Sequence, residues 1–144
     1  MSNTNRKGRR DWRDWAGRAL LALAAIGAAV AFVSALGDVT GATDPTRVLV
    51  TWRFLGLGFF AGVFALLAIR PRGHAGLFEL AILNKAALAV LGLAYGPGVT
   101  GAPSLVIFDG GLAVVLVAAY VLTRGWTAWR VGREGRPRDR VQAA

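Results

Sequence analysis

The sequence predicts an all-α membrane protein in which four transmembrane helices pack as an up-down-up-down bundle. Hydrophobic residues make up 55% of the 144 residues and charged residues only 17%, whereas soluble domains average about 25% charged residues. The charges are nearly absent from four runs of about 20 residues, the length that a helix needs to cross a bilayer core of about 30 Å. These two observations exclude a water-soluble globular domain and a disordered chain.

The four runs are rich in Ala and Leu and show no alternation of period two, so they fit helices rather than strands. They cover residues 19–36, 48–69, 76–95 and 105–122. Together they form one membrane domain, residues 19–123, between a basic tail of residues 1–18 and a second basic tail of residues 124–144. The few polar groups of interest inside the runs are Arg53, Glu79, Asn84, Lys85 and Asp109.

Local sequence signals mark the ends of the runs. Asp44-Pro45 is typical of an N-cap followed by proline at the first helical position, and Ser104 is a second candidate cap. Breaks after the second and third runs are expected at Pro71-Arg72-Gly73 and at Gly96-Pro97-Gly98. Four tryptophans flank the membrane domain as an aromatic belt: Trp12, Trp15, Trp126 and Trp129.

The distribution of Lys and Arg predicts the orientation. The two tails and the loop that holds Arg70 and Arg72 carry 14 of these residues, whereas the other two loops carry only Arg47. The positive-inside rule then places both termini in the cytoplasm. Arginine outnumbers lysine 15 to 2 and Ala and Gly dominate the sequence, as in GC-rich bacterial coding sequences, so we expect the cytoplasmic membrane of a bacterium. A cleavable signal peptide ending near Val33-Ser34-Ala35 is the alternative, but the apolar run is longer than the usual 7 to 15 residues.

Charged groups at membrane depth cost about 2.5 to 3.5 kcal/mol each, so they need partners. Arg53 lies about 7.5 Å inside the outer end of the second run, and Asp109 about 6 Å inside the outer end of the fourth, at a rise of 1.5 Å per residue. Because the depths match, we expect an Arg53–Asp109 ion pair. Such a pair could be structural, or it could serve as a proton or substrate site.

Lys85 lies near the middle of the third run. Its side chain should lean toward the cytoplasm and that of Asp109 outward, so the sequence argues against a direct pair between them. Two interpretations stay open. Lys85 either snorkels past Glu79 to the cytoplasmic interface, or it lines a polar cavity together with Glu79 and Asn84.

Three other features have ordinary structural explanations. Gly58 and Gly62 form a GxxxG motif, which allows close helix packing either inside the bundle or in a dimer. Tyr120 shares a helix face with Asp109 and is expected to pack. His74 lies in a short loop and is expected to be solvated.

The sequence offers no chemistry for an enzyme. It contains no cysteine and one histidine, which excludes disulfides, thiolate nucleophiles, iron–sulfur clusters and a multi-histidine metal site. We therefore expect no catalytic residue, no metal and no cofactor. The basic tails suit anionic lipid headgroups, whereas nothing resembles a module that reads nucleic acid.

The four short spans, together with the Arg53-Phe54-Leu55-Gly56-Leu57-Gly58 opening of the second, resemble the DoxX-like small four-helix membrane proteins of bacteria. The likeness covers about residues 19–123 in architecture. It implies a four-helix bundle that often serves as an accessory subunit, and it carries over no catalytic residue.

Three functions compete at this point. The first is a non-enzymatic accessory or assembly subunit that packs against a larger membrane partner or a second copy of itself. The second is a small transporter or proton-coupled carrier that uses the intramembrane charges. The third is a holin-like pore former, suggested by small size and a highly charged tail.

Overall fold

The computed structural model describes residues 4–130, with side chains from residue 11 onward. Four helices are long and apolar enough to cross a membrane, over Asp11–Gly41, Asp44–Ile69, Leu77–Tyr95 and Ala102–Thr123. No strand occurs among the described residues. The predicted all-α, four-helix architecture is thereby confirmed. Most of the predicted second basic tail, residues 131–144, lies outside the described residues.

The chain begins with one long helix. Helix α1 runs over Thr4–Gly41 and has 38 residues, so the predicted span 19–36 lies in its C-terminal part and much of the first basic tail is helical. It is followed by α2 (Asp44–Ile69) and α3 (Leu77–Tyr95). The fourth span is built from the short α4 (Ala102–Ser104), a π-helical turn η1 (Leu105–Asp109) and α5 (Gly110–Thr123); a 3₁₀ turn η2 (Gly125–Thr127) follows.

The helix ends agree with the sequence in part. Helix α2 ends at Ile69, two residues before Pro71. Helix α3 ends before Gly96. The φ angle of Gly96 is +77°, a positive value that glycine adopts at little cost. Two predictions of N-cap residues, at Asp44 and Ser104, are wrong. The N-cap of α2 is the extended Thr43, with Asp44 in the first turn and Pro45 following, and Ser104 lies inside a helix that starts after the left-handed Gly101.

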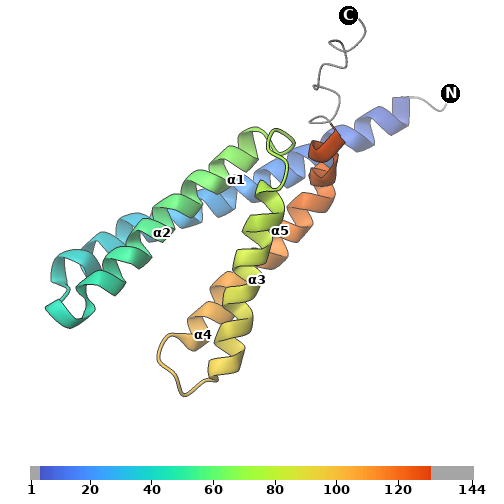
Figure 1. Cartoon of the computed structure of the whole chain (residues 1–144). Coiled ribbons are helices and arrows are strands. Elements are labelled where there is room, and N and C mark those ends of the chain that lie inside the picture. The colour runs from blue at the N-terminus through green and yellow to red at the C-terminus, as the bar shows by residue number, and fades with distance from the viewer. Residues whose placement is uncertain (1–3, 131–144) are drawn as a thin grey trace, which may run out of the picture.

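The four spans form two antiparallel hairpins (Figure 1). In the first, α1 and α2 pack closely: the rings of Phe32 and Phe54 stack with centroids 4.3 Å apart, and Gly58 leaves room for Phe32. In the second, Gly92 of α3 lies so close to Ala102 and Val106 that a Cβ atom would clash with both. Gly62 has no such neighbour, so only one glycine of the GxxxG motif serves packing within the described chain.

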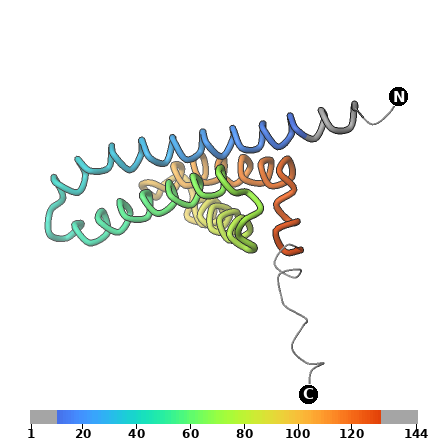
Figure 2. The backbone as a smooth tube through the Cα atoms, turned by 90° about the horizontal axis from the view of Figure 1, so that it is seen from above, coloured from blue at the N-terminus to red at the C-terminus, as the bar shows by residue number. Residues whose placement is uncertain are grey.

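The hairpins meet at one end and diverge toward the other (Figure 1). The start of α1, the loop 70–76 and the end of α5 lie at the shared end (Figures 1 and 2); we call it the basic end because Arg70 and Arg72 lie there. The exposed belt tryptophans Trp12, Trp15, Trp126 and Trp129 belong to the same chain segments.

The hydrophobic core lies toward the basic end. Its fully buried side chains include Leu21 of α1, Phe64 and Leu67 of α2, Phe78 of α3 and Leu116 of α5. All four spans therefore contribute to one core. Beyond it, toward the loops 42–43 and 96–101, each hairpin continues without the other.

Candidate functional site

A buried ion pair joins the third and fourth spans. The Lys85 Nζ atom lies 2.7 Å from Oδ1 of Asp109, and the two side chains are 9% and 14% exposed. The ring of Phe60, from α2, covers the ammonium group with its centroid 4.0 Å from Nζ. A cation over an aromatic face is attracted by the ring quadrupole, so Lys85 has both a charge partner and an aromatic lid.

The backbone around Asp109 is not a regular α-helix. Residues Leu105–Asp109 form a π-helical turn, in which the N–H of Gly110 donates to the carbonyl of Leu105, five residues back. Such wide turns occur often at functional sites and change the direction of the side chains they carry. Asp109 is the last residue of this turn and its carboxylate reaches Lys85.

The predicted Arg53–Asp109 pair is wrong. Arg53 Nη1 instead lies 3.9 Å from Oδ2 of Asp38, and both side chains are more than half exposed. Equal depth does not bring the two residues together, because α2 packs along α1 and separates from the second hairpin at that level (Figure 1).

The prediction that Lys85 and Asp109 do not pair directly is also wrong. It rested on the direction of the Cα–Cβ bonds, which lean toward the start of each helix. Three flexible methylene groups follow the Cβ atom in lysine, and they allow the ammonium group to reach the carboxylate of Asp109. Lys85 therefore neither snorkels to the interface nor faces an open polar cavity.

Glu79 belongs to a different cluster, near the basic end. Its Oε1 accepts hydrogen bonds from the Tyr120 hydroxyl at 2.8 Å and from Trp129 Nε1 at 2.9 Å. Tyr120 also contacts Phe78 and Trp126 edge-to-face. Glu79 therefore links the start of α3 to the end of the fourth span and to Trp129 beyond it. Tyr120, expected from the sequence as an interface or packing residue, packs and also donates a hydrogen bond.

Asn84 is exposed on α3 and lines a groove between α2 and α3. The groove has a volume of about 470 Å³, and all its other lining residues are apolar: Phe59, Phe60, Val63, Leu77, Leu80, Ala81, Leu83 and Ala87. Glu79, Asn84 and Lys85, which the sequence placed in one possible cavity, thus lie in three different surroundings.

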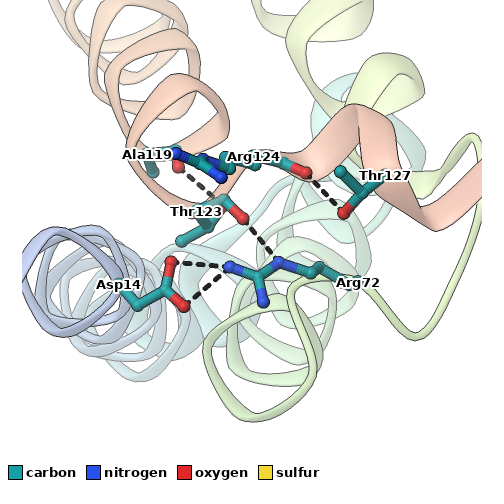
Figure 3. A network of polar contacts seen from close by, with 6 residues as sticks. All are labelled: Asp14, Arg72, Ala119, Thr123, Arg124 and Thr127. Carbon is teal, nitrogen blue, oxygen red and sulfur yellow. Dashed lines mark hydrogen bonds and ion pairs between the residues drawn. The ribbon is translucent and has the colours of Figure 1, made fainter. Parts of the chain in front are cut away.

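A second polar cluster, missed by the sequence analysis, joins three segments at the basic end (Figure 3). Arg72 Nη2 donates to both carboxylate oxygens of Asp14, at 2.6 and 2.7 Å, and its Nε donates to the carbonyl of Thr123 at 2.7 Å. The Thr123 hydroxyl, fully buried, donates to the carbonyl of Ala119. Arg72 therefore links α1, the loop 70–76 and the end of α5. Its only sequence signal was its place in a basic loop.

We expect Arg72→Ala to lower the unfolding free energy by about 1 to 2 kcal/mol, because charge-assisted bonds are strong but this cluster is partly exposed. Arg72→Lys should recover little of this loss, since a lysine lacks the planar fork that binds a carboxylate through two bonds. Denaturant titration in detergent measures both. Arg18→Ala, an exposed cation on α1, is the control and should change stability by less than about 0.5 kcal/mol; an equal loss there would contradict the assignment.

Among the described residues, no group of three or more His, Cys, Asp or Glu side chains gathers as a metal site would require. The polar contacts described above are the Lys85–Asp109 ion pair, the hydrogen bonds of Glu79 with two aromatic donors, and the contacts of the loop residue Arg72 with Asp14 and Thr123. Comparison with protein-family models, with curated proteins and with solved structures finds no match to this chain.

Proposed function

We propose that this small multi-pass membrane protein is a non-enzymatic accessory or assembly subunit, which contacts a membrane partner through the wedge between its two hairpins. By wedge we mean the sides of α2 and α3 that turn toward each other where the two helices diverge beyond the shared core, toward the loops 42–43 and 96–101 (Figure 1). The proposed setting is the cytoplasmic membrane of a bacterium, and a relation to the DoxX-like proteins is part of the proposal.

The observation that carries this proposal is the divergence of the hairpins. On α2, Trp52 and Leu55 continue the face of the groove residue Phe59 at helical spacing, and they are 75% and 59% exposed. On α3, Leu91 continues the face of Ala87 and is 45% exposed. The wedge thus presents exposed, large apolar side chains from two helices that diverge away from the core (Figure 1), which are the groups that another apolar helix would cover.

Site-specific photo-crosslinking in cells tests this function. A photoreactive amino acid at Leu55 or Leu91 should give one discrete adduct, whose partner is identified by mass spectrometry. Val33 of α1 and Val114 of α5 are equally apolar and about 70% exposed, and serve as controls that should label lipid. Adducts of equal yield at the control positions, or none at the wedge positions, would contradict the proposal. Co-expression of tagged and untagged chains distinguishes a second copy from another protein.

We propose that the basic end faces the cytoplasm, because it carries the excess of Lys and Arg. Reporter fusions after residues 42, 73, 100 and 144 should therefore read outside, inside, outside and inside. A reporter at residue 73 or 144 that reads outside would contradict the proposed orientation.

The alternative function is a small ion-coupled transporter, and the Lys85–Asp109 pair favours it, because buried ionisable residues inside membrane spans often mark proton or substrate paths. The purified chain in liposomes should then carry a proton flux that Lys85→Met abolishes. A subunit without transport activity should give the background flux of empty liposomes, so the two functions separate in one assay.

A further inference from the structure

We propose that the groove between α2 and α3 is a binding site for one anionic phospholipid of the leaflet at the basic end, with an acyl chain in the groove and the headgroup phosphate at Arg70. The proposal concerns the core half of the α2–α3 face and does not depend on the partner in the wedge.

The depth of the groove matches one leaflet. Along α3 its lining extends from Leu77, the first residue of the helix, to Ala87, which is about 15 Å at 1.5 Å per residue. Half of a bilayer core is also about 15 Å. Trp129 packs against Gly76 and is half exposed, and tryptophan is enriched at the membrane interface. The groove therefore starts at the interface and ends near the midplane.

The size and lining of the groove favour an acyl chain over a protein helix. A helix 15 Å long and about 10 Å wide fills roughly 1,200 Å³, whereas the groove holds about 470 Å³. A protein helix is therefore too large to enter the groove, whereas one acyl chain of a lipid can lie inside it. The walls are apolar apart from the Asn84 amide, as the hydrocarbon of a lipid requires.

The charge at the mouth selects an anionic headgroup. Arg70 and His74 lie in the loop that joins the two groove-lining helices, and both are exposed. Neither takes part in an ion pair among the described residues, whose four ion pairs join other groups. The two nearby carboxylates have other partners: Asp14 binds Arg72, and Glu79 accepts from Tyr120 and Trp129. Anionic lipids attract cations that lie at the membrane surface, so Arg70 is placed to bind the phosphate.

Native mass spectrometry of the full chain, delipidated and then titrated at pH 7.5 with phosphatidylglycerol or phosphatidylcholine, tests this site. One phosphatidylglycerol per chain should bind at least fivefold more tightly than phosphatidylcholine, and Arg70→Gln should remove this preference, as expected for one surface cation. Ala87→Phe, which fills the inner end of the groove, should weaken both lipids at least tenfold. Free glycerophosphate, a headgroup without chains, should not bind measurably.

Two controls make the result specific. Arg18→Gln removes the same charge at the same end from α1, which does not line the groove, and should leave the preference unchanged. An equal effect of Arg18→Gln and Arg70→Gln would show diffuse attraction and overturn the site. Unchanged binding in Ala87→Phe, with wild-type circular dichroism, would place the chain elsewhere. A lipid-free dimer that Ala87→Phe dissociates would make a second copy the occupant of the groove, and would also overturn the proposal.

Discussion

Replacing Asp109 by leucine should cost about 3 to 5 kcal/mol of unfolding free energy, because it leaves the Lys85 ammonium buried without its charge partner. Lys85→Met should cost a similar amount, since it leaves the carboxylate of Asp109 uncompensated. This expectation differs from that for an isolated lysine inside a membrane span, whose removal would be harmless or favourable. The difference follows from the 2.7 Å contact between Nζ and Oδ1.

The double variant Lys85→Met/Asp109→Leu should recover most of the loss, because two apolar side chains of similar volume replace a pair whose burial was itself costly. Unfolding of the detergent-solubilised chain by denaturant, followed by tryptophan fluorescence, measures all three. Arg53→Leu is the matched control: its pair with Asp38 is long and exposed, so the change should stay below about 1 kcal/mol. Additive losses in the double variant would mean that Lys85 and Asp109 do not stabilise each other.

The fold was accessible from the sequence because the bilayer sets the length of each apolar run. The breaks at Pro71 and Gly96 were also readable, since proline and glycine act on the local backbone. The caps at Thr43 and Gly101 were missed by one to three residues because several residues near each end can cap a helix. The length of α1 was missed because its early part is polar, and hydropathy detects only the apolar part of a helix.

The sequence identified the charged residues of the candidate site but did not predict which of them form a pair. Lys85 and Asp109 were recognisable as charges that need partners, yet matching depths assigned Asp109 to Arg53. Depth gives position along the membrane normal and says nothing about which helices are neighbours in the membrane plane. The π-helical turn at Leu105–Asp109 and the contact of Arg72 with Asp14 depend on tertiary packing in the same way.

The arrangement also relates the ion pair to the groove. Phe60 lines the groove with one part of its surface and covers Lys85 with its ring. It therefore separates the apolar groove from a buried charge. A displacement of Phe60 would therefore alter both the lining of the groove and the cover over Lys85.

Gly17→Leu should separate the two hairpins at the basic end and lower the unfolding free energy by at least about 2 kcal/mol, as overpacking of a tight contact does. A Cβ atom on Gly17 would lie 2.5 Å from Thr123 Cγ2 and 3.3 Å from the carbonyl oxygen of Ala119. The backbone oxygen cannot rotate away, and Thr123 is fully buried, so α1 and α5 must move apart.

Gly27→Leu provides the matched control, since a Cβ atom on Gly27, in the same helix, meets nothing within 4 Å. That variant gains the better helix propensity of leucine without a clash and should be as stable as the original chain or slightly more stable. Spin labels on cysteines at positions 18 and 126, introduced into this cysteine-free chain, should report a longer distance in Gly17→Leu only. Equal stability and equal label distance in the two variants would show that α1 and α5 do not touch at Gly17, and that the shared core does not hold the hairpins together there.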